Sequence, residues 1–163
     1  MEKGDYVLPK DCDFNDIEDI TFEAPCSPVF TNSKFTGVVI NVPKTVVIDE
    51  VFKVNICARY RHRIADALSL GAPFHNSIVF VAVDKATQEV FSGKVDQGEN
   101  VLPAPDEQQS DAEVDESIRV GGYLNPDLVQ VIGLPRKPAS YVVYATVGTY
   151  KSNVMDLEIK KAG

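Results

Sequence analysis

Residues 140–147 read SYVVYATV, and residues 153–160, beyond a short loop that contains Gly148, read NVMDLEIK. The first segment is rich in β-branched and aromatic residues. In the second, Met155, Leu157 and Ile159 alternate with charged side chains. Alternation with period two is typical of strands that bury one face. We therefore expect these two segments to form a final pair of strands.

The pattern continues upstream. Further strands are predicted over residues 36–42 (ending at Pro43), 45–48, 52–61, 78–83, 90–95 and 118–120. Only short helical turns are expected, one over 64–70 and one opened by Asn125 as cap, Pro126 and Asp127. Seven or eight short strands separated by turns predict an all-β fold, an antiparallel sandwich.

One stretch resembles a known architecture. Residues 134–145, LPRKPASYVVYA, resemble the corner between strands E and F of immunoglobulin-like and fibronectin-type sandwiches, and 148–154 resembles the hairpin that follows. The resemblance implies that Tyr141 is the corner tyrosine, with its hydroxyl bonded to upstream backbone. Ala139 stands where such corners often have glycine, Val143 stands where antibody domains have a cysteine, and tryptophan is absent. The resemblance concerns the fold and implies no particular activity.

The composition narrows the class of protein. The chain has 163 residues, of which 44% are hydrophobic and 25% charged, and this is ordinary for one globular domain. No apolar run approaches the 18 or so residues of a membrane-spanning helix, so no membrane insertion is expected. A net charge of −8 disfavours nucleic acid as a partner.

Acidic residues are concentrated in two segments. Residues 1–34 hold eight acids and three lysines, and they are interpreted as an acidic extension ahead of a sandwich domain over 35–163. Within the extension, Ile20–Phe22 could form an edge strand. Residues 96–116 hold eight acids and no base, which predicts a solvated loop.

The most distinctive local feature is a row of arginines. Arg59, Arg61 and Arg63 would share one face of a strand at intervals of about 6.8 Å, with Lys53 further along that face. Guanidinium groups in a row suit carboxylates, sulfates or phosphates. The row is therefore a candidate site for an anionic ligand or another protein. The competing interpretation is that an acidic segment of the same chain neutralises it.

Three cysteines leave two possibilities open. Cys12 and Cys26 could close a short disulfide loop, or all three thiols, including Cys57, could be free. The absence of a signal peptide favours free thiols in the cytoplasm; a signal already removed would imply a secreted or periplasmic protein.

Catalytic and cofactor motifs are missing. No nucleotide-binding, zinc-binding or hydrolase motif occurs, so neither a cofactor nor a metal is expected. The run from Asp11 to Asn15 starts like a calcium loop, but the matching glycine and glutamate do not follow. Cys57, His62 and His75 are interpreted as structural residues. We therefore expect a non-enzymatic binding or interaction module; the alternatives are a self-assembling structural subunit and, less favoured, an enzyme whose site is invisible in the sequence.

Overall fold

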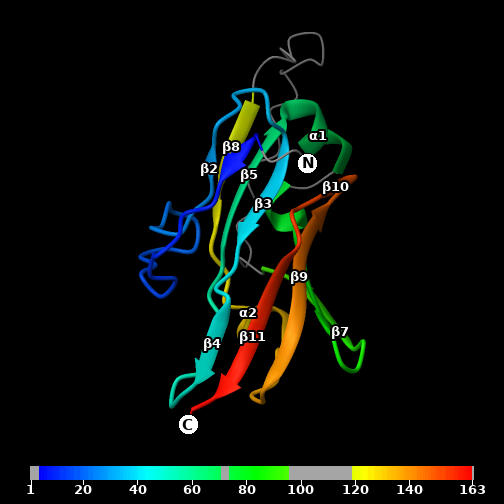
Figure 1. Ribbon diagram of the computed structural model, residues 1–163. Coiled ribbons are helices and arrows are strands. Elements are labelled where there is room, and N and C mark those ends of the chain that lie inside the picture. The colour runs from blue at the N-terminus through cyan, green and yellow to red at the C-terminus, as the bar shows by residue number, and fades with distance from the viewer. Residues whose placement is uncertain (1–3, 71–73, 96–118, 163) are drawn as a thin grey trace.

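The computed structural model describes residues 4–70, 74–95 and 119–162, and strands dominate them (Figure 1). The strands are β1 (Tyr6–Val7), β2 (Val29–Phe30), β3 (Gly37–Asn41), β4 (Thr45–Ile48), β5 (Cys57–Arg63), β6 (Val79–Asp84), β7 (Val90–Lys94), β8 (Arg119–Leu124), β9 (Ala139–Val147), β10 (Tyr150–Lys151) and β11 (Met155–Lys161). The helices are short: α1 (Ile64–Leu70), the 3-10 turn η1 (Phe74–Ser77) and α2 (Leu128–Ile132). In these ranges no helix is long and apolar enough to cross a membrane.

Two sheets make up the body of the protein. The smaller sheet has the order β3-β5-β8 and is antiparallel throughout. The larger has the order β4-β11-β9-β6-β7, with β10 paired to β9, and β4 runs parallel to β11. The prediction of a mostly β fold is confirmed, and the arrangement is compatible with a β-sandwich. The prediction of a wholly antiparallel structure is wrong, because of the β4–β11 pair.

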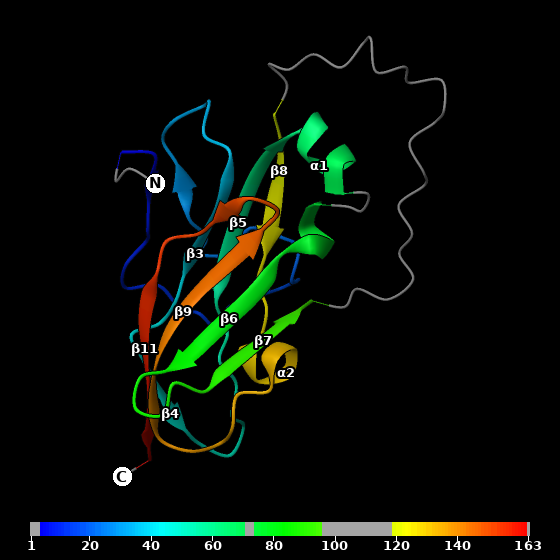
Figure 2. The same ribbon diagram turned by 90° about the vertical axis from the view of Figure 1, so that its right-hand side faces the viewer.

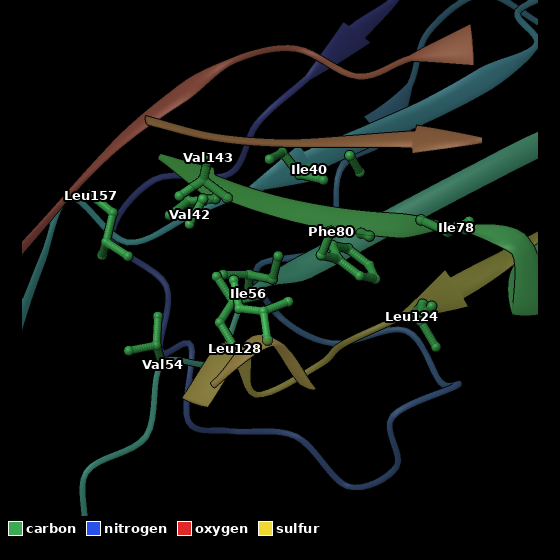
Figure 3. Packing of buried hydrophobic residues seen from close by; sticks show 14 of the residues in the cluster. Ile40, Val42, Val54, Ile56, Ile78, Phe80, Leu124, Leu128, Val143 and Leu157 are labelled. Atoms are coloured by element: carbon green, nitrogen blue, oxygen red, sulfur yellow. The ribbon is translucent and has the colours of Figure 1, made fainter. Parts of the chain in front are cut away.

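The hydrophobic core lies between the two sheets (Figure 3). Its fully buried members come from alternate positions of the strands, as period-two patterns require. Ile40 of β3, Phe80 of β6 and Leu157 of β11 are at most 1% exposed. The predicted alternation of Met155, Leu157 and Ile159 is confirmed, since the latter two are buried and Met155 packs against the core.

The chain changes sheets at Pro43. β3 belongs to the smaller sheet and β4 to the larger, and a proline, which has no N–H to donate, suits the break between them. The side chain of Asn153 bridges the two sheets at this edge. Its Nδ2 donates to the Ile40 carbonyl at 2.9 Å, and its Oδ1 accepts from the Ile40 N–H at 2.9 Å.

Two predicted boundaries need correction around β5 and α2. The strand predicted over 52–61 begins only at Cys57. The backbone of Val54 instead bonds to the start of α2, donating to the Asp127 carboxylate and accepting from Leu128 N–H. Asp127, not Asn125, is the N-cap, because its side chain accepts from Val129 N–H. The cap was thus misplaced by two residues.

Residues 4–35 lie against the outer face of the smaller sheet (Figure 1). Cys26 and Phe35 are buried there together with Val39 and Cys57 of the sheet. The acidic segment therefore packs on the sheet in the part described, while a domain boundary between residues 34 and 35 stays a prediction. The predicted acidic loop over 96–116 lies outside the described residues.

The edge strand predicted at Ile20–Phe22 is wrong. These residues form a turn in which the Asp19 carboxylate accepts from both Thr21 N–H and Thr21 Oγ1, each at 2.8 Å. An aspartate that bonds to the backbone two residues later favours a turn over a strand. The turn is attached to the sandwich by Asn125, whose amide donates to the carbonyls of Asp19 and Phe22.

Tyr141, the tyrosine of the predicted corner, does not form the hydrogen bond expected of it. Tyr141 is fully buried and its ring contacts Phe91 edge to face, with 6.0 Å between centroids. Its hydroxyl has no hydrogen-bond partner among the described residues. The predicted bond to upstream backbone is therefore wrong, and packing rather than a polar tie holds this ring.

Candidate functional site

The predicted row of arginines lies on the outer face of the smaller sheet. β5 contains Arg59, Arg61 and Arg63 at alternate positions, as expected. Lys53 does not continue the row, because it lies ahead of β5 and outside the strand, with its own side chain exposed. The β-sheet register places Tyr123 opposite Arg59 and Arg119 opposite Arg63 on β8.

Arg59 and Arg61, called here the arginine pair, enclose the ring of Phe30. The guanidinium carbons lie 4.5 Å (Arg59) and 4.8 Å (Arg61) from the centre of that ring. Arg59 also lies 5.1 Å from the centre of the Tyr123 ring. Such cation–π contacts stabilise guanidinium groups without neutralising them.

The hydrogen bonds of the arginine pair go to backbone carbonyls. Arg59 Nη1 donates to the Pro28 carbonyl at 3.4 Å, and Arg61 Nη1 donates to the Asn32 carbonyl at 3.0 Å. Each guanidinium has five N–H donors, so most donors of both groups stay available. Both side chains are partly exposed and can be reached from solvent.

No carboxylate of the described residues forms an ion pair with Arg59 or Arg61. Burial, followed by the charges of Arg59 and Arg119, lowers the pKa of the Arg61 guanidinium. The acidic segment of the same chain therefore covers the arginine pair with rings and carbonyl groups rather than with acids. The carboxylates of this segment that lie nearby have other partners: Glu23 accepts from the Tyr123 hydroxyl at 2.9 Å, and Asp5 accepts from the Asn32 side-chain amide at 2.9 Å. The other acidic segment of the competing interpretation, residues 96–116, lies outside the described residues.

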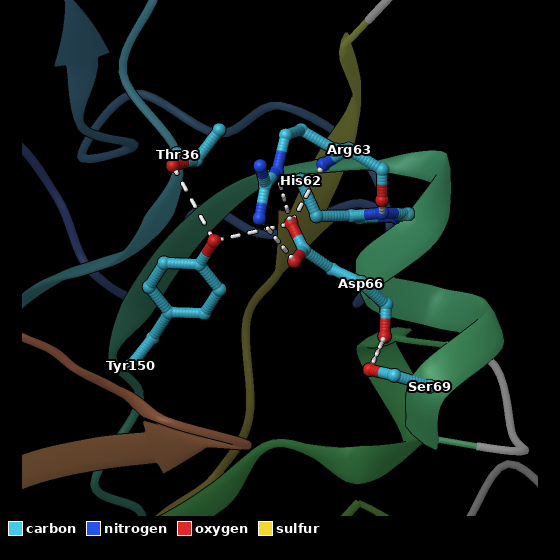
Figure 4. Close-up of polar contacts among 6 residues, drawn as sticks. All are labelled: Thr36, His62, Arg63, Asp66, Ser69 and Tyr150. Carbon is cyan, nitrogen blue, oxygen red and sulfur yellow. Dashed lines mark hydrogen bonds and ion pairs between the residues drawn. The ribbon is translucent and has the colours of Figure 1, made fainter. Parts of the chain in front are cut away.

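Arg63, by contrast, is neutralised within its own turn (Figure 4). Its Nη2 lies 3.1 Å from Asp66 Oδ1, and its backbone N–H donates to Asp66 Oδ2 at 3.0 Å. The Tyr150 hydroxyl donates to the same carboxylate at 3.1 Å. This network connects the end of β5 and the start of α1 to β10.

The network also sets the charge of Asp66. Burial raises the pKa of this carboxyl, but hydrogen bonds from Arg63 and Tyr150 outweigh burial, so the net pKa is lowered. The hydrogen bond and charge of Asp66 in turn raise the pKa of Arg63. Arg63 is therefore a structural residue and does not share the open character of the arginine pair.

The histidines and the free cysteine lie apart from the arginine pair. His62 is buried and stacked on Phe74, with 4.3 Å between ring centroids, and its Nδ1 lies 2.8 Å from the Arg63 carbonyl. His75 stacks on Tyr60, and burial together with the charge of His62 lowers the pKa of His75. Burial raises the pKa of the Cys57 thiol to about 12, which makes it a poor nucleophile at neutral pH.

Cys12 and Cys26 form a disulfide with Cα atoms 5.4 Å apart. The expectation of three free thiols is therefore wrong for two of them, and Cys57 is the free one. The bond closes a loop within residues 4–35, the segment that covers the arginine pair. The Asn41 amide fixes this region to β3 by donating to the carbonyl of Cys26, where the loop ends, and to that of Pro9, three residues before the loop begins.

No group of three or more His, Cys, Asp or Glu side chains in the described ranges is placed to hold a metal ion. In the calcium-like run, Asp13 Oδ1 accepts from Asn15 N–H and so stabilises a local turn.

Sequence reasoning missed the aromatic members of the site. Phe30 and Tyr123 are 29 residues before and 64 residues after Arg59 by their numbers. Only the pairing of β5 with β8 and the packing of residues 4–35 bring them together. No local pattern carries that information. No known protein-family model matches this chain, and no curated protein matches it at a significant level.

Proposed function

We propose that this protein is a non-enzymatic binding module that holds an acidic, extended segment of another protein on Arg59 and Arg61. The observation that carries the proposal is an unneutralised pair of adjacent, partly exposed guanidiniums in a chain of net charge −8. Acids are abundant in this chain, yet none of those described pairs with either group. Guanidinium groups with spare donors favour carboxylates, which they bind with two hydrogen bonds at once.

The spacing supports an extended peptide as ligand. Residues two apart on a strand are separated by about 6.8 Å, and carboxylates at alternate positions of an extended peptide repeat with the same period. The rings of Phe30 and Tyr123 restrict the guanidinium groups in advance. Less conformational entropy is then lost on binding.

We infer further that the sandwich is of the immunoglobulin-like kind. Support comes from the strand orders β3-β5-β8 and β4-β11-β9-β6-β7, and from the passage of the chain between sheets at Pro43. The resemblance of residues 134–145 to an E–F corner points the same way. Tyr141 departs from it, since its hydroxyl lacks the expected partner. Sandwiches of this kind serve many binding functions, so the ligand is argued from the arginine pair alone.

The Cys12–Cys26 disulfide supports a proposal about the cellular compartment of the protein. Stable disulfides belong mainly to oxidising compartments, so Cys12–Cys26 favours a secreted or periplasmic location over the cytoplasm. Trapping the free thiols with an alkylating reagent in the source cells tests this. The protein is unfolded in the presence of the reagent, because Cys57 is buried. One labelled cysteine per chain is then expected, and three would contradict the proposal.

The binding proposal is tested with a synthetic peptide of alternating glutamate and threonine, titrated by fluorescence anisotropy. A charge-assisted hydrogen bond contributes about 1.5–3 kcal/mol, so Arg59→Gln and Arg61→Gln should each weaken binding about tenfold or more. Lys53→Gln removes one positive charge away from the arginine pair and is the matched control. A peptide with glutamine in place of glutamate should not bind. Equal loss in all three variants, or no binding by the glutamate peptide, would contradict the proposal.

A further inference from the structure

The outer face of the larger sheet carries an apolar patch that does not belong to the core. Val79, Val81 and Val83 of β6 point outward, and the register places Tyr144 opposite Val81 and Val142 opposite Val83. These five residues, called here the valine–tyrosine face, are absent from the core cluster between the sheets. Val81, at their centre, is 8% exposed, and the other four are half-buried. Val90 lies opposite Val83 at the margin of the patch and is 59% exposed.

The two outer faces of the sandwich differ in how they are covered. On the smaller sheet, residues 4–35 bury Val39 and Cys57 completely. On the larger sheet no described element lies over the valine–tyrosine face, which is turned toward the viewer in Figure 2. A contiguous apolar patch on a sheet of β-branched residues marks a surface for association.

The charges around this face differ between its two ends. At one end Lys94 lies opposite Val79, and Lys151 lies opposite Thr146 of β9. Neither lysine forms an ion pair with a described carboxylate. Lys151 instead lies over the Tyr144 ring, 4.6 Å from its centre.

At the other end stand the carboxylates of Asp156 and Glu158. Each pairs with one lysine of its own end, Lys85 at 2.8 Å and Lys160 at 3.5 Å. Their side chains are nonetheless 78% and 50% exposed. Each therefore has room for a second cation.

We propose that a second copy of this chain covers the valine–tyrosine face in a two-fold symmetric dimer. Two-fold symmetry places the same patch on both sides of the interface. Running the strands of the two copies antiparallel brings Lys94 and Lys151 of each copy toward Asp156 and Glu158 of the other. The opposite orientation would bring Lys94 and Lys151 of one copy against the same two lysines of the other, and these have no ion-pair partner among the described residues. Like charges across an interface are disfavoured. Packing of two sheets face to face is a stable arrangement for such surfaces.

This inference does not depend on the arginine pair, which lies on the opposite side of the sandwich. A dimer joined at the larger sheets leaves both arginine pairs facing outward. It would therefore bind two acidic segments at once, and linked ligands would be held more tightly than single ones.

Sedimentation velocity on the full chain tests the dimer, with loading from micromolar to millimolar concentration. The wild type should shift from monomer to dimer over this range. Tyr144→Glu should raise the dimer dissociation constant at least about thirtyfold, as expected for a central tyrosine of an interface. Val7→Glu is the matched control, since Val7 is 55% exposed and lies on β1, away from this face. It should leave the dissociation constant unchanged.

Charge-reversal variants test the antiparallel orientation of the two copies. Lys151→Glu should weaken the dimer, and combining Lys151→Glu with Asp156→Lys should restore it, because the pair is then reversed in both copies. Circular dichroism confirms that each variant is folded. A chain that stays monomeric at every concentration would overturn the proposal, and the face would then be left to another protein or to the chain's own residues. A dimer insensitive to Tyr144→Glu would overturn it too.

Discussion

Replacing Phe30 with leucine tests how the arginine pair is held, because Phe30 is the residue that both guanidiniums share. Leucine keeps an apolar side chain at the position but removes the aromatic face. The two cation–π contacts, at 4.5 and 4.8 Å, should contribute about 0.5–1 kcal/mol each at a partly exposed site. The contact with the Phe35 ring at 4.9 Å should add about 0.5–1.5 kcal/mol. Phe30→Leu should therefore lower the free energy of unfolding by about 1.5–3.5 kcal/mol.

A double-mutant cycle isolates the contact with one arginine. Arg61→Gln alone should cost little stability, because burial and the charges of Arg59 and Arg119 already disfavour its cationic form. The coupling energy between Phe30→Leu and Arg61→Gln should be about 0.5–1 kcal/mol.

Urea unfolding of the wild type, both single variants and the double variant gives this coupling. Val29→Thr is the control on the same short strand, and as a surface substitution it should stay within about 0.5 kcal/mol of the wild type. A coupling of zero would refute the reasoning that the ring holds the guanidiniums. Loss of stability in Phe30→Leu no greater than in the control would refute it as well.

Three further outcomes are expected. Reduction of Cys12–Cys26, which opens a loop with a sequence separation of 14, should lower the free energy of unfolding by about 3 kcal/mol in urea titrations; unchanged midpoints would contradict this. Asp66→Asn should destabilise the protein at neutral pH. Because the folded-state pKa of Asp66 is lowered, its contribution is present above the unfolded value of 3.8 and disappears as pH falls through the folded value, so the two stability curves should converge in acid. Cys57, with a pKa of about 12, should resist alkylation at mildly alkaline pH until urea unfolds the chain; rapid labelling of the native protein would show that the thiol is accessible.

The strands of the sandwich could be predicted because the alternation of apolar and polar residues along a strand reflects which of its faces is buried. Val79–Asp84 and Met155–Lys161 are found within a residue or two of where alternation and apolar runs placed them. The eight strands of four or more residues in the described ranges match the expected number. Period two is a local property, so it survives without knowledge of the partner strands.

The errors share a physical cause, which is competition from contacts distant in sequence. Residues 52–56 carry a strand pattern, but Asp127 bonds to the backbone of Val54 and fixes the segment against α2 instead. Similarly, Asn125 looks like a helix cap, but its amide is used by the turn at Asp19. Both side chains act on backbone far away, and such partners are invisible in a local pattern.

The spacing of the arginine row could be predicted from the sequence, but its surroundings could not. The alternate spacing of Arg59 and Arg61 is local and was found, whereas Arg63 was grouped with them although Asp66, three residues later, neutralises it. Phe30 and Tyr123, which distinguish the arginine pair from an ordinary charged surface, come from other strands. Of the two acidic segments considered as partners of the row, residues 4–35 supply the Phe30 ring and carbonyl groups, and residues 96–116 lie outside the described residues.

The most direct test of the binding proposal follows the Nε–Hε resonances of the arginines by ¹⁵N–¹H NMR while the alternating glutamate–threonine peptide is added. The resonances of Arg59 and Arg61 should move together and saturate with one affinity, while that of Arg136, which donates to the Asp49 carbonyl elsewhere on the surface, stays in place. Resonances of Arg59 and Arg61 that do not move, or equal shifts at Arg136, would contradict the proposal that the arginine pair is the binding site.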